Sequence, residues 1–123
     1  MKKGILMLGD DELILSILEE LFTYEDYDVK MLSDAHTLIQ TIQQYLPNVV
    51  LVDYLLDSNG ENICHLIKST RLTSKIPVII ISAYARDPNS LETYNCDVFI
   101  SKPFDIDLLF KTIDDCIQFR ISN

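Results

Sequence analysis

The sequence predicts an α/β domain in which a parallel sheet is covered by helices on both faces. Five short apolar runs recur at fairly even intervals along the 123 residues, and stretches with helical periodicity separate them. Most of these runs lack polar alternation, as strands buried on both faces do. Strands that alternate with helices form crossover units, so the strands should lie parallel in one sheet. The expected strands are Ile5–Leu8, Tyr27–Leu32, Val49–Val52, Val78–Ile81 and Val98–Ile100.

The first two helices are predicted by apolar residues spaced three and four positions apart. The first helix follows the acidic pair Asp10-Asp11, which suits a helix N-terminus. The second follows the capping signal Ser33-Asp34, and Pro47 ends it because proline cannot continue a helix. The apolar positions are Leu13, Ile14, Ile17, Leu18, Leu21 and Phe22 in the first helix, and Leu38, Ile39, Ile42 and Leu46 in the second.

The helices in the second half of the chain are predicted by less regular apolar spacing. A third helix, with Ile63, Leu66 and Ile67, follows a polar loop that ends at Gly60. The segment Pro88–Tyr94 is expected to form only a short helix. Pro103 introduces the last helix. No repeat or linker interrupts the chain, so residues 1–123 are expected to form a single domain. The last helix has its apolar positions at Ile106, Leu109, Phe110, Ile113 and Ile117.

The run Tyr27–Leu32 alternates polar with apolar residues, as an edge strand exposed on one side does. With the second strand at an edge, the flavodoxin-like order 2-1-3-4-5 fits. The predicted fold is therefore a flavodoxin-like (βα)5 doubly wound sandwich. In such sheets ligands bind at the carboxyl ends of the strands, at the point where the strand order reverses.

Composition excludes several classes of function. The net charge of −9 argues against direct binding to nucleic acid or to an anionic membrane. The first apolar run is far too short for a signal or membrane segment. We therefore expect a cytoplasmic protein that acts through protein partners. The cysteines form no metal-ligand pattern and are expected to be reduced core residues, whereas the two histidines are expected on the surface. These residues are Cys64, Cys96, Cys116, His36 and His65.

The stretch from Asn48 to Gly60 organises the expected site. A buried strand runs directly into Asp53, and it must end where a carboxylate can reach water. Asp53 is therefore expected at the carboxyl end of the central strand. Residues with charged or hydroxyl side chains also follow three other strands, and the fold brings the ends of all four strands to the same carboxyl edge of the sheet. They are Asp10 and Asp11 after the first strand, Ser82 after the fourth, and Ser101 and Lys102 after the fifth.

These residue types favour phosphoryl chemistry that depends on a metal ion. Three neighbouring carboxylates repel one another unless a cation lies between them or one is protonated. Oxygen ligands without His or Cys suit a hard ion such as Mg²⁺. Lys102 adds a positive charge and Ser82 a hydroxyl donor, so the group can neutralise a phosphoryl group carried by Asp53. Carboxylates are established nucleophiles for such transfers.

Four segments together resemble the receiver domain of two-component response regulators. They are Leu8–Glu12, Val50–Asp53, Ile80–Ala83 and Phe99–Phe104, in the right order and at the right spacings over essentially the whole chain. The resemblance implies that Asp53 is the phosphoacceptor and that a histidine kinase or a histidine phosphotransfer protein is the donor. It also implies a signalling domain rather than an enzyme, with only self-catalysed phosphotransfer and dephosphorylation.

The same resemblance implies roles for the surrounding residues. Asp11 would bind Mg²⁺ directly and Asp10 largely through water, with Asp53 and the backbone carbonyl of Leu55 as further ligands. Ser82 and Lys102 would contact the phosphoryl oxygens. Two further features, the usual cis peptide and the switch aromatic of the family, correspond to Lys102-Pro103 and Phe99.

The implied switch couples Ser82 to Phe99. Phosphate on Asp53 would draw the Ser82 hydroxyl inward, and Phe99 would occupy the space left behind. That would remodel the face formed by Pro88–Tyr94, Val98–Ile100 and the last helix, where an output domain, a downstream protein or a second copy of the chain would dock. A plain core role for Phe99 is an equal alternative.

The sequence departs from the receiver family at two positions, and two alternative functions are considered. The loop after Asp53 lacks the proline frequent in the family, and Gly9 is atypical but expected to be harmless. One alternative is a receiver-like interaction module that does not use phosphate. Another α/β enzyme or binder is disfavoured: the acidic residues after the first strand would repel an FMN phosphate, and a haloacid-dehalogenase-type phosphatase would need an aspartate where Leu55 stands.

Overall fold

The structure, a computed structural model, describes residues 2–9, 11–32, 36–53, 57–82 and 97–119, with the backbone alone described at 57–62, 82 and 119. The strands are β1 (Gly4–Gly9), β2 (Asp28–Leu32), β3 (Val49–Asp53), β4 (Val78–Ser82) and β5 (Val98–Ser101). The helices are α1 (Glu12–Tyr24), α2 (Leu38–Tyr45), α3 (Asp57–Ser69) and α5 (Ile106–Phe119). The segment Pro88–Tyr94, expected to be a short helix, lies outside the described residues.

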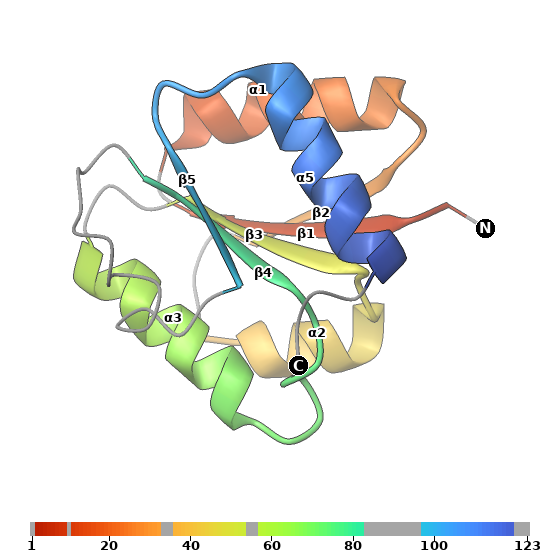
Figure 1. Ribbon diagram of the computed structural model, residues 1–123. Coiled ribbons are helices and arrows are strands. Elements are labelled where there is room, and N and C mark those ends of the chain that lie inside the picture. The colour runs from red at the N-terminus through yellow and green to blue at the C-terminus, as the bar shows by residue number, and fades with distance from the viewer. Residues whose placement is uncertain (1, 10, 33–35, 54–56, 83–96, 120–123) are drawn as a thin grey trace.

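The strands form one parallel sheet in the order β2-β1-β3-β4-β5, which confirms the flavodoxin-like fold class. Helices α1 and α5 cover one face of this sheet, and α2 and α3 cover the other (Figure 1). All residues of β1 and β3 are buried, as their unbroken apolar sequences predict. Strand β2 leaves Asp28, Lys30 and Met31 exposed, which confirms it as an edge strand.

Alternation along the strands divides the core into two layers. Ile5 and Met7 of β1 pack in the layer under α1 and α5, whereas Leu6 and Leu8 pack in the layer under α2 and α3. Each layer thus consists mainly of side chains from alternate positions of the same strands. Cys64 and Cys116 are buried and reduced, as expected, and Cys96 lies outside the described residues.

Two helix starts differ from the sequence prediction. Helix α2 begins at Leu38 rather than just after Ser33-Asp34, and Thr37 at its N-cap makes no side-chain capping bond. Burial of Leu38 and Ile42 therefore holds this helix, rather than a cap. Helix α3 begins at Asp57, so Gly60 lies in its first turns and does not end a loop. The Asp, Ser and Asn residues taken for a loop are also the types that favour a helix N-terminus.

The ends of β4 and β5 opposite the carboxyl rim are held by a buried ion pair. Lys68, near the end of α3, lies 2.5 Å from Asp97, and both side chains are largely buried. The Lys68 ammonium also donates to the carbonyls of Ser74 and Ile76, at 3.3 and 2.7 Å. The Asp97 carboxylate accepts from the backbone N–H of Val78 at 2.8 Å. The pair therefore joins α3 to the first residues of both strands.

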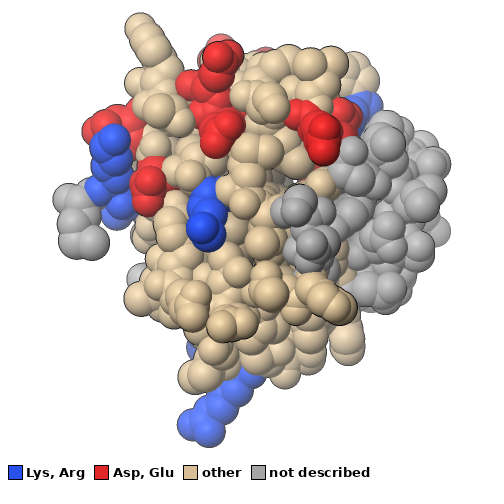
Figure 2. All heavy atoms as spheres, turned by 180° about the vertical axis from the view of Figure 1, so that it is seen from behind, with Lys and Arg blue, Asp and Glu red and all other residues tan. Residues whose placement is uncertain are grey.

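The surface of the described chain is acidic on one side. Carboxylates gather over α1 and the turn that follows it, while the lower half of the same view carries few charges (Figure 2). His36 and His65 are exposed, as expected. In the part of the chain that the structure describes, no helix is both long and apolar enough to span a bilayer.

Candidate functional site

Three strands bring the candidate site together at the carboxyl edge of the sheet. Gly9, the last residue of β1, pairs in register with Asp53, the last residue of β3. Asp11 is the second residue after β1, and Lys102 is the first residue after β5. The order β1-β3-β4-β5 thus carries residues more than forty positions apart in the chain to one place.

Lys102 contacts two carboxylates at once. Its ammonium lies 2.7 Å from an oxygen of Asp53 and 3.2 Å from Oδ2 of Asp11. Burial by itself lowers the pKa of Lys102, but hydrogen bonds and attraction from Asp53 and Asp11 outweigh it and raise that pKa. The lysine therefore stays charged and holds the two aspartates close together. The peptide bond that follows it, Lys102-Pro103, is cis, as the resemblance implied.

Asp53 differs from the expectation in one respect. Its side chain was expected to reach water at the end of β3, yet its exposed fraction is 0%. A charged carboxylate can be buried in this way because Lys102 lies against it and compensates the lost hydration. The side chains of Lys102 and Asp11, which adjoin Asp53, are 14% and 25% exposed and so do reach solvent.

Asp11 serves two parts of the structure. Its Oδ1 accepts from the backbone N–H of Ile14 at 3.3 Å and so caps α1, as predicted from the acidic pair. Its Oδ2 faces Lys102. The first turn of α1 thereby fixes the orientation of a carboxylate that the site uses, and the helix N-terminus favours its negative charge.

Gly9 is a site residue whose importance the sequence prediction missed. A Cβ at this position would overlap the backbone carbonyl oxygen of Asp53 and lie 2.9 Å from the carbonyl carbon. Only glycine allows β1 to approach β3 so closely at Asp53, so the glycine that was expected to be atypical but harmless is in fact required there. The sequence does place this glycine directly before the acidic pair. However, the steric reason for a glycine there comes from the register of β1 with β3, which the sequence alone does not reveal.

The other predicted residues are placed less completely. Phe99 is half-buried in β5 and packs against the core layer under α2 and α3. Ser82 is the last residue of β4 and pairs in register with Ser101, but only its backbone is described. Asp10 and Leu55 lie outside the described residues. The structure thus brings Asp53, Asp11 and Lys102 together and leaves the contacts of the rest untested.

The described donors fit a hard divalent cation. In the ranges that the structure describes, no three His, Cys, Asp or Glu side chains converge on one point. However, the carboxylates of Asp11 and Asp53 already share one cationic partner, the Lys102 ammonium. Carboxylate oxygens of this kind, with access to solvent past Asp11, suit Mg²⁺, which keeps several of its waters. The described donor set therefore fits Mg²⁺, and the sequence prediction adds Asp10 and the Leu55 carbonyl to it.

An apolar groove adjoins the site. It has a volume of about 500 Å³ and runs between α1 and the segment after β5. Ile17 and Leu18 line one wall, and Pro103 and Phe104 line the other, with Lys102 at the same wall. Ile17 is exposed although it is apolar. The lysine that faces the two carboxylates thus also borders a surface suited to another apolar group.

Comparisons with known proteins agree with this geometry. A sequence model described as the response regulator receiver domain matches residues 5–114. The chain is 27% identical to Response regulator PleD of Caulobacter vibrioides over 98% of its own length, and it spans only 27% of that protein. It is 23% identical to the Polar-differentiation response regulator DivK of Brucella ovis, covering 92% of this chain and 94% of the relative.

A solved structure shares the fold. The receiver domain of sensor histidine kinase PA1611 from Pseudomonas aeruginosa, which has a magnesium ion coordinated in its active site cleft, superimposes with a TM-score of 0.81. The match covers 95% of this chain and 98% of that one at 18% identity. At that identity the likeness concerns the fold.

Proposed function

Because the chain belongs to the response regulator receiver domain family, we propose that Asp53 accepts a phosphoryl group from a phosphohistidine donor in a Mg²⁺-dependent reaction. The observation that carries this proposal is the contact of one ammonium, that of Lys102, with both the Asp53 and Asp11 carboxylates. Residues 1–123 together act as the receiver domain, in the cytoplasm. The domain signals and does not turn over a separate substrate.

The transfer forms one bond and breaks one. An Asp53 oxygen attacks the phosphorus atom, the phosphorus–nitrogen bond of the donor breaks, and the histidine nitrogen keeps the electron pair. Lys102, 2.7 Å from Asp53, moves with little rearrangement from the carboxylate to the new phosphoryl oxygens. Asp11 and Asp53, together with Asp10 and the Leu55 carbonyl, would hold Mg²⁺, which would supply further positive charge against the phosphoryl oxygens. The Ser82 hydroxyl donates a hydrogen bond to the same phosphoryl group.

The signal leaves the site through β4 and β5. Ser82 ends β4, and Phe99 lies in the adjacent strand within the core layer under α2 and α3. A shift of the Ser82 hydroxyl toward phosphate changes the space available to Phe99, which alters the face formed with α5. A downstream protein, an output domain or a second copy of the chain would bind that face.

The donor is a protein, a sensor histidine kinase or a histidine phosphotransfer protein. The apolar groove between α1 and Pro103 supports this, because a small phosphodonor would not need such a surface beside Lys102. The negative charge of the chain is unsuited to nucleic acid and to anionic membranes as direct partners.

The proposal is tested by intact mass after incubation with acetyl phosphate and Mg²⁺. One phosphoryl adduct is expected on the wild type, and none on Asp53→Asn or without Mg²⁺. Asp115→Asn is the matched control, since it removes a carboxylate that pairs with Lys111 on the surface of α5 and should leave the adduct intact. An adduct on Asp53→Asn would place the acceptor elsewhere.

One observation favours a second function, the phosphate-independent interaction module. Asp53 is fully buried, so an acceptor role requires the donor to reach it past Lys102. Absence of any adduct on the wild type, with Mg²⁺ binding established by titration, would decide for this module.

A further inference from the structure

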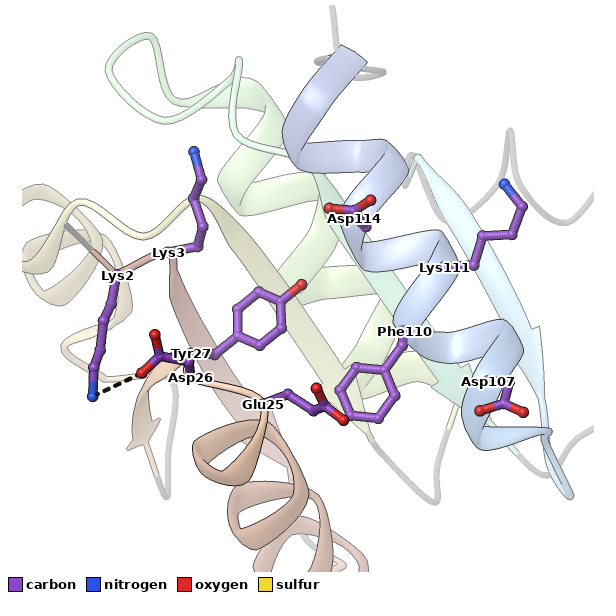
Figure 3. Close-up of a pocket in the computed structure, with 9 residues that line it drawn as sticks. All are labelled: Lys2, Lys3, Glu25, Asp26, Tyr27, Asp107, Phe110, Lys111 and Asp114. Atoms are coloured by element: carbon purple, nitrogen blue, oxygen red, sulfur yellow. Dashed lines mark ion pairs between the residues drawn. The ribbon is translucent and has the colours of Figure 1, made fainter.

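A second pocket lies between α5, the residues that precede β1 and the turn that precedes β2 (Figure 3). Its volume of about 670 Å³ is within the range of small-ligand sites. Its lining comes from three separate parts of the chain: the residues before β1, the turn between α1 and β2, and α5. None of the described residues around Asp53 contributes to it, and the proposed phosphoryl chemistry does not use it.

Two aromatic rings form the apolar part of this pocket. Tyr27 and Phe110 both meet the buried ring of Phe22 edge-on, with centroids 6.1 and 5.4 Å away and interplanar angles of 72° and 87°. The backbone N–H of Tyr27 also donates to the carbonyl of Phe22 at 2.9 Å, which fixes the turn that carries Tyr27. These contacts hold both rings in place, so a ligand would not have to order them.

Most of the ammonium groups at the rim are already engaged. Lys2 lies 3.5 Å from the carboxylate of Asp26, and Figure 3 draws this pair at the edge of the pocket. Lys111 lies 3.0 Å from Asp115, which does not belong to the lining. Lys111 points away from the rings in the same view. Only Lys3 among the lining ammonium groups has no ion-pair partner within the described residues.

Carboxylates face the rings. Glu25 lies beside Phe110, and Asp114 projects from α5 above the same space (Figure 3). Among the residues that the structure describes, neither of these carboxylates has an ion-pair partner, although Asp114 accepts from the side-chain amide of Gln118 at 3.2 Å. Burial, and then repulsion from Asp114 and Glu25, raises the pKa of Tyr27, in keeping with a negative potential at its ring.

We propose that this pocket binds a small organic cation, an alkylammonium or guanidinium ion, with its charge facing Glu25 and Asp114 and its carbon chain against the Tyr27 and Phe110 rings. Aromatic faces and carboxylates both attract such ions, and the rings exclude water from the carbon chain. An anion would meet these carboxylates with Lys3 alone to offset them. A neutral apolar ligand would leave the charged rim without a partner.

The test is calorimetric titration of the full chain at about 0.1 M NaCl with spermidine as a free polyamine and, in parallel, with acetyl-arginine amide as a mimic of a protein side chain. Saturable binding is expected, about 5-fold weaker for Asp114→Asn and for Tyr27→Leu, since an exposed ion pair and the attraction of an organic cation to an aromatic ring are each worth up to about this order of affinity. Tyr27→Phe, which keeps the ring, should bind nearly as the wild type and guards against loss of folding. Glu19→Gln, an exposed position of α1 outside the lining and outside the printed ion pairs, is the control that makes the same change of charge.

The outcomes separate the possibilities. Tighter binding of spermidine supports a free polyamine, and tighter binding of acetyl-arginine amide supports an arginine side chain as the occupant. The absence of saturable binding of either probe up to about 10 mM would overturn the proposal. So would an equal loss of affinity in Glu19→Gln and Asp114→Asn, because binding would then report the overall charge of −9 rather than this pocket.

Discussion

Replacement of Lys102 by methionine tests the electrostatic basis of the site. The change keeps most of the apolar stem but removes the ammonium that lies 2.7 Å from Asp53 and 3.2 Å from Asp11. At an effective dielectric constant of about 20, each of these contacts is an attraction of about 5 to 6 kcal/mol before the cost of desolvation. Removal of one partner from a buried ion pair destabilises a protein by about 3 to 5 kcal/mol. Because Asp11 is partly exposed, we expect a loss of about 3 kcal/mol at pH 7.5 without Mg²⁺.

The assay is equilibrium unfolding in urea. With a slope of about 1.5 kcal/mol per molar for a domain of this size, the midpoint should fall by about 2 M. Lys111→Met is the matched control, because it breaks an ion pair whose lysine is 71% exposed and should change the free energy of unfolding by less than about 0.5 kcal/mol. Mg²⁺ should restore part of the loss in Lys102→Met by supplying another cation for the two carboxylates.

A Lys102→Met protein within about 0.5 kcal/mol of the wild type at pH 7.5 would refute the view that the lysine compensates the two aspartates.

Four further outcomes follow from the described contacts. Gly9→Ala should lower the free energy of unfolding by about 2 kcal/mol or more, because the added Cβ would overlap the Asp53 carbonyl. Gly4→Ala is the control: its Cβ would meet the Tyr45 hydroxyl at 3.3 Å, and the free energy of unfolding should fall by less in the same urea assay. Burial and the hydrogen bond to Asp28 raise the pKa of Tyr45 to about 12. The contribution of Tyr45 to the free energy of unfolding should therefore be present below pH 10 and vanish between pH 10 and about 12. Tyr45→Phe should remove this pH dependence from the unfolding curves. Lys68→Met should destabilise the fold by about 3 kcal/mol, far more than Lys111→Met, since Asp97 would be left buried without its ammonium. Burial, followed by repulsion from Asp97 and Asp115, raises the pKa of the Cys116 thiol to about 11, so mass spectrometry should find Cys116 unlabelled by iodoacetamide at pH 8 until urea unfolds the chain.

The sheet was predictable because its signals are local. All five strands were recognised from short apolar runs, and the polar alternation of Tyr27–Leu32 identified the edge. Strand order then brought Asp53, Asp11 and Lys102 together without any knowledge of side-chain contacts. Parallel strands share one carboxyl edge, so a residue that directly follows a strand is placed by topology alone.

The features that were missed depend on contacts between distant residues. The burial of Asp53 requires Lys102 to lie against it, and the restriction at Gly9 requires the register of β1 with β3. The start of α2 depends on packing of Leu38 and Ile42 rather than on a local cap. In the same way, the pocket around Tyr27 and Phe110 joins parts of the chain about eighty residues apart, which no local pattern reveals.

The buried pair of Lys68 and Asp97 has a mechanical consequence. It fastens the first residues of β4 and β5 to α3, at the end of the sheet far from Asp53. Because β4 and β5 are also paired with each other along their length, this anchor fixes the starting point of both strands and, through them, the positions from which Ser82 and Lys102 extend. Sliding of β4 and β5 relative to α3 would have to break the buried ion pair, so the ion pair opposes such sliding.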